Sequence, residues 1–228
     1  MLEALIFDFD GVVVDSEPIH LVCFSNVLAG LDVAMTREDY YGKYLGFDDH
    51  DCFAAVLQDN GRDTDEKLIT RLIAQKTTLV RQAISSDIQA LPGAFELISA
   101  AAQAGVALAI CSGALRPEID LALEKIGAAD KFLVVVSAED VSRGKPEPEG
   151  YVLTVRRLTE VLGRQVQGRQ CVVIEDSPAG IDAAHGAGLC VLGVTTSYPP
   201  AAMSGADRVV ALLSDVRLAD LAAMVDRR

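Results

Sequence analysis

Two aspartates two positions apart, followed directly by a glycine, are the residues of this chain best suited to do chemistry. Asp8 lies near the end of the apolar segment 4–9, and Asp10 and Gly11 follow this segment directly. Residues i and i+2 of a strand face the same side, so this spacing predicts that both carboxylates project together at the carboxyl end of a strand. Adjacent carboxylates repel each other and are costly to bury. A divalent cation would relieve that cost, and one carboxylate could then serve as a nucleophile or proton carrier.

Two further segments offer groups that suit an anion. Ser112 and Gly113 follow an apolar segment and supply a hydroxyl and free backbone N–H groups, which together can cradle an anion. Lys145 lies between a glycine and a proline, on a loop that this context makes stiff. Each feature alone has an ordinary explanation as a loop or a solvated charge.

A last pair of acids, Glu175 and Asp176, stands at the end of another apolar segment. By itself this pair would be typical of a helix N-terminus, because Ser177 and a proline follow it. Together with Asp8 and Asp10 it supplies three or four acids, which suits a hard cation such as Mg²⁺.

The elements that must position these groups alternate along the chain. Short apolar segments predict strands, and segments of helical length lie between them, which indicates a parallel sheet with right-handed crossovers. Loops at the carboxyl edge of such a sheet converge, so the four groups are expected to meet there. The predicted strands are residues 4–9, 106–111, 132–137, 171–175, 190–194 and 208–211, and the predicted helices are 94–104, 117–126, 149–162 and 179–187, with a final amphipathic helix in 214–228.

The stretch from about residue 16 to residue 86 breaks this alternation. It contains no convincing strand and predicts helices over 21–29, 37–45, 49–58 and 65–84. We therefore expect an α-helical insertion after the first strand, joined to the sheet by two connections that could act as a hinge.

Composition limits the classes of partner. The chain has 228 residues, half of them hydrophobic, and a formal net charge of −13. This charge argues against nucleic acid and anionic membranes as partners, because both require clustered Lys and Arg. The sequence shows neither a transmembrane segment nor a signal peptide, so a cytoplasmic protein is expected. Its cysteines form no C-x-x-C pair and are expected to be reduced. We expect a monomer or a homodimer.

The four groups together resemble the motifs of the haloacid dehalogenase superfamily, in the family's order. Residues 8–12 fit the first motif D-x-D-G-[TV], Ser112 the second, Lys145 the third, and Glu175 with Asp176 the fourth. The resemblance covers essentially the whole chain. Within the superfamily, the chain resembles the branch that contains β-phosphoglucomutase and phosphoglycolate phosphatase. This resemblance implies an α/β fold with a Rossmann-like, doubly wound core (residues 1–15 and 89–228) and an inserted α-helical cap (residues 16–88).

The resemblance also implies roles in catalysis. Asp8 would attack the phosphorus of a small phosphorylated metabolite and form an aspartyl-phosphate, and Asp10 would act as general acid and then general base. Ser112 and Lys145 would hold the phosphoryl oxygens. Backbone N–H groups near Gly11 and Gly113 would complete the phosphate cradle.

A Mg²⁺ site is implied as well. The resemblance assigns the metal to the Asp8 carboxylate, the backbone carbonyl of Asp10, and Asp176, with Glu175 as a further ligand or a neighbour of the ligands. Such a site would use a few carboxylates together with water and substrate oxygens.

The reaction is expected to be hydrolysis of a phosphate monoester, and two alternatives remain open. His20 and Lys76 resemble cap and hinge positions of the phosphomutases. His20 is a candidate residue of the substrate-binding site, where it would tune the proton transfer of Asp10, and a structural histidine is the alternative. Lys76 alone would be expected to be a solvated lysine. The mutases usually carry an arginine in a cap loop that grips a second phosphate. The corresponding residues here, 45–51, contain aspartates instead, so Coulomb repulsion favours the phosphatase over a sugar phosphomutase. The other alternative is a protein that binds a phosphometabolite without turnover.

Overall fold

The computed structural model describes residues 1–226 and divides into two compact units. The core unit comprises Met1–Asp15 and Ile88–Arg228, and the helical unit comprises Ser16–Asp87. The helical unit is thus inserted in the sequence between the first and second strands of the core unit. Within residues 1–226, none of the helices has the length and apolar character needed to cross a membrane.

The core unit is built on a six-stranded sheet with the order β3-β2-β1-β4-β5-β6, in which every pairing is parallel. β1 is central: Ile6 lies beside Ala109 of β2 and beside Val173 of β4. The sheet therefore reverses direction of growth at β1, which is the place where open α/β sheets bind ligands. The strands are β1 (Ala4–Phe7), β2 (Ala107–Cys111), β3 (Val134–Val136), β4 (Cys171–Glu175), β5 (Cys190–Val194) and β6 (Arg208–Val210).

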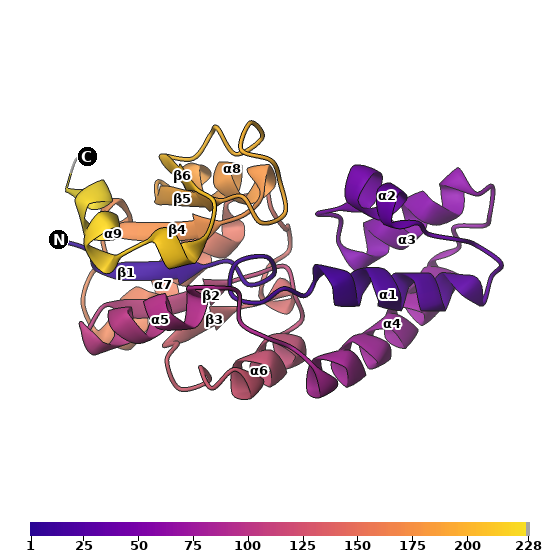
Figure 1. Cartoon of the computed structure of the whole chain (residues 1–228), viewed down its shortest axis with the longest axis horizontal. Helices are drawn as coiled ribbons and strands as arrows, with labels where there is room; N and C mark the ends of the chain where they lie inside the picture. Colours follow the sequence, from indigo (N-terminus) through magenta and orange to yellow (C-terminus); the bar gives the residue numbers. More distant parts are fainter. Residues whose placement is uncertain (227–228) are drawn as a thin grey trace. The chain divides into compact units, whose positions relative to one another are not determined.

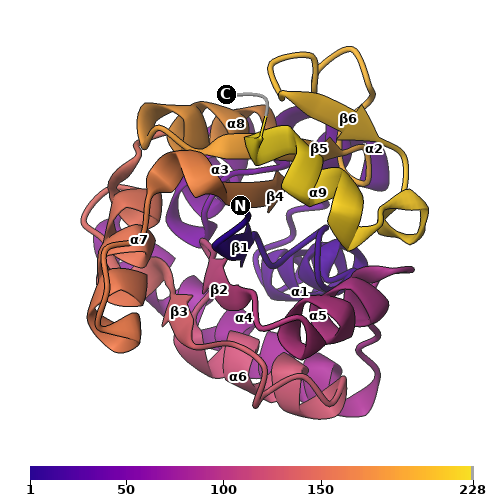
Figure 2. The ribbon, with the colours of Figure 1, turned by 90° about the vertical axis from the view of Figure 1, so that its left-hand side faces the viewer.

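Helices cover both faces of this sheet, as Figure 2 shows. α7 and α8 pack on one face, and α5 and α9 on the other. Because both faces are covered, β1, β2, β4 and β5 are buried along their whole length, and this explains their nearly continuous apolar sequences. The core helices are α5 (Ala94–Gln103), α6 (Arg116–Lys125), α7 (Glu149–Leu162), α8 (Pro178–Gly186) and α9 (Leu218–Val225).

The helical unit has its own hydrophobic core. Phe24, Phe53 and Leu72 are among its buried side chains, and the ring centroids of Phe24 and Phe53 lie 4.9 Å apart. The unit is formed by α1 (Glu17–Ala29), α2 (Arg37–Asp39), a π-helical turn (Tyr40–Tyr44), α3 (Asp49–Asp59) and the long α4 (Glu66–Ser86), all labelled in Figure 1 except the π-helical turn.

The prediction of the first strand was wrong at its end. β1 stops at Phe7, and residues 9–14 form a tight turn in which the N–H groups of Val13 and Val14 donate to the carbonyl of Phe9. Asp8 and Asp10 therefore lie beyond the strand, and Asp10 is placed by the turn and not by strand alternation. The predicted helix 214–228 is also shorter than expected: α9 begins at Leu218, and residues 227–228 lie outside the described part of the chain.

Candidate active site

Asp8 stands at the carboxyl end of the central strand. Its backbone N–H donates to the carbonyl of Ile174 over 2.9 Å, which extends the pairing of β1 with β4 by one residue. The residue is only 8% exposed. The strand pairing therefore fixes the backbone of Asp8, and the fold places its carboxylate in a buried position.

Lys145, of the third motif, contacts both Asp8 of the first motif and Glu175 of the fourth. Its Nζ lies 2.7 Å from Oδ1 of Asp8 and 2.5 Å from Oε1 of Glu175. Although burial lowers it, the charges of Asp8 and Glu175 raise the pKa of Lys145 above its usual value. Lys145 is therefore a fixed cation between two buried carboxylates.

Glu175 is fully buried, and both of its oxygens are occupied by donors. Oε2 accepts from the N–H of Asp176 and from both the N–H and the hydroxyl of Ser177, at 3.0–3.1 Å. Oε1 accepts from Lys145 and, over 2.8 Å, from the hydroxyl of Tyr151. A Cβ on Gly180 would lie 1.8 Å from Oε1, so only glycine at this position leaves room for the carboxylate.

Asp176 is held by a residue that follows β5. Its Oδ2 accepts a short hydrogen bond from the hydroxyl of Ser197, in the loop that follows β5. Gly11 passes so close that a Cβ there would lie 1.9 Å from the same oxygen, and its φ of +72° is in any case one that favours glycine. The glycine of the first motif thus makes room for a carboxylate of the fourth.

Asp8, Glu175 and Asp176 form a buried acidic cluster that suits a divalent cation. One carboxylate oxygen from each lies within 4.8 Å of the others. The pKa of Asp8 is raised to about 7. Burial is the largest cause, Lys145 partly offsets it, and the charge of Glu175 adds to it. Burial, followed by the charges of Asp8 and Glu175, also raises the pKa of Asp176 well above its usual range. More negative charge is buried here than one lysine offsets, and hard oxygen ligands of this kind fit Mg²⁺.

The second motif lies on the neighbouring strand. Ser112 follows β2 and is 6% exposed; its N–H donates to the carbonyl of Val136, and its Oγ accepts from the N–H of Ala114 over 2.9 Å. This hydrogen bond orders the loop through Gly113. The contacts of Ser112 are thus with its own loop and with β3, whereas Lys145, Glu175 and Asp176 are joined to Asp8 through direct contacts or the acidic cluster.

Asp10 belongs to the turn after β1. It pairs with Val14 in an isolated bridge, and its charge contributes to the raised pKa of Asp8. The two carboxylates therefore interact electrostatically, and the turn places Asp10 whereas the continued pairing with β4 places Asp8.

His20 and Lys76 lie in the helical unit, where they contact each other. The Nζ of Lys76 is 3.0 Å from Nδ1 of His20, forms an ion pair with Asp49, and lies 4.2 Å from the ring centroid of Phe24. The expectation that Lys76 is solvated was wrong: its side chain is 3% exposed. The partner carboxylate and the aromatic face together compensate the burial of this charge.

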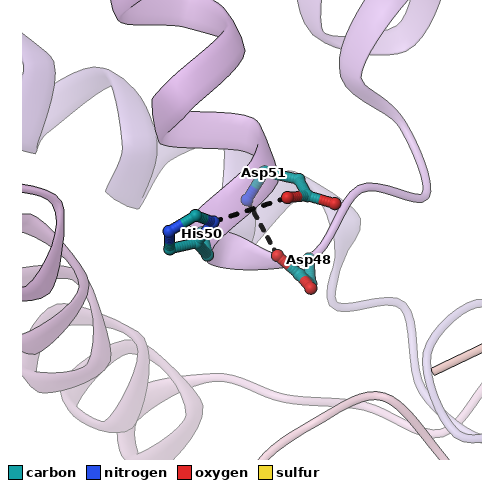
Figure 3. Close-up of side chains that lie close together, drawn as sticks. All are labelled: Asp48, His50 and Asp51. Carbon is teal, nitrogen blue, oxygen red and sulfur yellow. Dashed lines mark hydrogen bonds and ion pairs between the residues drawn. The ribbon is translucent and has the colours of Figure 1, made fainter. Parts of the chain in front are cut away.

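Figure 3 shows a second acidic cluster, at the exposed N-terminus of α3. Asp48 caps the helix by accepting from the N–H of Asp51 over 2.8 Å, and His50 lies 3.4 Å from the Asp51 carboxylate and 3.1 Å from Glu66. Helix capping and surface ion pairs account for these contacts, so this cluster supports no metal site.

Two residues of the site were missed in the sequence. Ser197 stands after β5 at the carboxyl edge of the sheet, and the rule that located the other motifs could have identified it. Tyr151 gave no such signal, because a tyrosine on the apolar face of α7 is indistinguishable from an ordinary core residue.

Comparisons with known proteins agree with this geometry. Residues 5–194 match the family model described as haloacid dehalogenase-like hydrolase. The phosphorylated carbohydrates phosphatase of Thermotoga maritima is 28% identical over 82% of this chain and 82% of that protein. Beta-phosphoglucomutase of Bacillus subtilis is 26% identical over 95% of this chain and 92% of its own length. The crystal structure of CbbY from Rhodobacter sphaeroides in complex with phosphate superposes with a TM-score of 0.87 at 28% identity, covering 97% of this chain and 99% of that one.

Proposed function

Because the chain belongs to the haloacid dehalogenase-like hydrolase family, we propose that this phosphoric monoester hydrolase cleaves small phosphate esters through an aspartyl-phosphate on Asp8, with Mg²⁺ as cofactor. The observation that carries the proposal is the buried ion pair of Lys145 with Asp8, in a cluster with Glu175 and Asp176. This cluster combines a carboxylate nucleophile, the fixed positive charge of Lys145 and acidic ligands for a metal ion, which are the parts that phosphoryl transfer requires.

Asp8 is the proposed nucleophile. A carboxylate oxygen attacks phosphorus, the ester oxygen leaves, and an acyl phosphate forms on Asp8. Asp10 gives its proton to the departing oxygen. It then takes a proton from the water that attacks the acyl phosphate, which releases inorganic phosphate and restores the Asp8 carboxylate.

Lys145 and Ser112 are proposed to bind the phosphoryl oxygens. Two of the three N–H groups of Lys145 are directed to Asp8 and Glu175, which leaves the third for the substrate. The hydroxyl of Ser112 and backbone N–H groups near Gly11 and Gly113 supply neutral donors at neighbouring strand ends. Donors fixed before the reaction stabilise developing charge without reorganisation.

Asp8, Asp176 and the backbone carbonyl of Asp10 are the proposed Mg²⁺ ligands. Glu175 belongs to the acidic cluster, but its oxygens already accept five hydrogen bonds, so we assign it mainly to holding Lys145. When bound, Mg²⁺ would neutralise the cluster and the phosphate charge.

Hydrolysis is favoured over phosphate relocation by the helical unit. Asp49, the first residue of α3, lies in the stretch 45–51 that corresponds to the phosphate-binding loop of the mutases, and it forms an ion pair with Lys76. The pair offsets the lysine charge, and Asp48 and Asp51 add exposed negative charge beside it. Acids at these positions cannot take over the phosphate-binding role that the arginine has in the mutases. A phosphorylated carbohydrate is the substrate class that agrees with the name of the phosphatase relative.

The test is phosphate release from p-nitrophenyl phosphate and a panel of sugar phosphates, with Mg²⁺, with EDTA, and with Asp8→Asn. Turnover that requires Mg²⁺ and disappears in Asp8→Asn is expected. If β-glucose 1-phosphate is instead isomerised, the mutase alternative holds. If phosphate raises the melting temperature and no ester is cleaved, the chain is a binding protein.

A further inference from the structure

We infer that Tyr151 is a positioning residue of this site, whose hydroxyl orients Glu175 so that Glu175 holds Lys145 against Asp8. The inference rests on the proposed function, because it concerns the same phosphoryl-transfer site. It adds a residue that lies outside the four sequence motifs and does not touch the reacting atoms.

The contacts of Tyr151 support this role. The residue lies in α7 and is 1% exposed, and its hydroxyl donates to Oε1 of Glu175 over 2.8 Å. Lys145 donates to the same oxygen over 2.5 Å, and its Nζ lies 5.4 Å from the centre of the Tyr151 ring. Tyr151 therefore contacts the anion that binds the lysine and also borders the lysine itself.

Tyr151 donates to the same oxygen of Glu175 that binds Lys145, and this distinguishes a positioning role from simple packing. Oε2 of Glu175 is held by Ser177 and by the N–H of Asp176, which fixes one end of the carboxylate. Oε1 is the end that binds Lys145, and Tyr151 is its other donor. One lone pair of Oε1 accepts from the Tyr151 hydroxyl, so the other lone pair is directed to Lys145.

This arrangement determines where the third N–H of Lys145 points. Two of its N–H groups are directed to Asp8 and Glu175, so a shift of Oε1 would turn the whole ammonium group. A donor that is displaced by a fraction of an ångström still attracts a phosphate but stabilises the transition state less well. Loss of the hydroxyl should therefore reduce kcat more than it raises KM.

The experiment is Tyr151→Phe, which removes one oxygen and keeps the ring. With p-nitrophenyl phosphate and saturating Mg²⁺, kcat is expected to fall about tenfold while KM changes less than about threefold. Tyr44→Phe is the matched control. It also removes the hydroxyl of a buried tyrosine that donates to a carboxylate, Asp59 Oδ2 at 2.6 Å, but this partly buried hydrogen bond lies in the helical unit, and its loss should leave kcat unchanged.

A double-mutant cycle tests the route through the lysine. If Tyr151 acts through Lys145, the variant carrying both Tyr151→Phe and Lys145→Ala should be no slower than Lys145→Ala alone. Multiplicative losses would show that Tyr151 acts independently of Lys145 and would overturn the inference.

Further outcomes are equally decisive. An unchanged kcat with a lowered melting temperature would make the hydroxyl merely structural, and so would a Tyr151→Phe chain that fails to fold by circular dichroism. Wild-type turnover, and its loss in Asp8→Asn, are measured in the same assay. A wild type without activity would contradict the proposed function, whereas an active wild type with a fully active Tyr151→Phe would contradict only the role of Tyr151.

Discussion

The Nζ atom of Lys145 lies 2.7 Å from Oδ1 of Asp8, although the two residues are far apart in the sequence. The same nitrogen lies 2.5 Å from Oε1 of Glu175. One ammonium group thus compensates two buried carboxylates, and Asp176 adds a third acid to the cluster. Charge balance in this site therefore depends on a single lysine.

Replacing Lys145 by Ala should impair both catalysis and stability. The change leaves Asp8 and Glu175 without their shared cation, so stability should fall by about 3–5 kcal/mol and kcat by about 10²–10³. Urea unfolding and phosphate release measure the two effects. Lys131→Ala is the control, because Lys131 pairs with Asp130 on the surface and should contribute less than about 1 kcal/mol. Equal effects of the two substitutions would refute the charge-balance argument.

Gly180→Ala should disrupt the site through Glu175. The added Cβ would lie 1.8 Å from Oε1, so the carboxylate must move and its hold on Lys145 must change. We expect kcat to fall about 100-fold, although alanine is intrinsically the better helix former by about 1 kcal/mol. Gly42→Ala is a suitable control, because its added Cβ has no atom within 4 Å apart from its chain neighbours and its own helix backbone. A Gly180→Ala enzyme with normal kcat would show that Glu175 can shift without consequence.

The metal-free protein should lose stability as the pH rises from about 4 to about 7. Asp8 releases its proton near 3.8 in the unfolded chain but near 7 in the folded one, so the folded state binds more protons between these values. Its stability therefore falls with pH there, by up to about 1.4 kcal/mol per pH unit for one group. Asp8→Asn removes this contribution, so the variant should gain stability relative to the wild type between pH 5 and pH 7.

Urea unfolding in EDTA at both pH values measures this gain. Asp140→Asn serves as the control: Arg157 holds the pKa of Asp140 at about 2, so this group stays ionised over the range and its removal should change stability equally at both pH values. Parallel pH dependence of Asp8→Asn and the wild type would contradict the assignment. Added Mg²⁺ should stabilise the wild type more at pH 7 than at pH 5, because the metal competes with protons.

Asp49→Ala should destabilise the helical unit. Lys76, whose side chain is 3% exposed, would lose the carboxylate that neutralises it and keep His20 and the Phe24 ring. A loss of about 2–4 kcal/mol is expected in urea unfolding. Asp51→Ala removes an acid that is 69% exposed and should change stability by less than about 1 kcal/mol. If the two variants unfold alike, the buried ion pair is not what Lys76 requires.

Much of the fold was accessible from the sequence. Apolar segments buried on both faces, separated by helical segments, predicted the parallel sheet, and the bounds of β4, β5 and α7 agree with those expected. The match to the family model confirms the family, and the superposition on the CbbY structure confirms the fold class. Local patterns suffice here because a strand between two layers of helices must be apolar throughout.

The tertiary structure decided how the site is held together. The sequence alone determined that carboxylates, a lysine and a hydroxyl stand at strand ends or in the loops that follow strands, since the nature of each side chain is local information. It could not show that Gly180 and Gly11 make room for the Glu175 and Asp176 carboxylates, or that Tyr151 and Ser197 donate to them. Those relationships join residues of different elements, and they depend on distances that only the packed core defines.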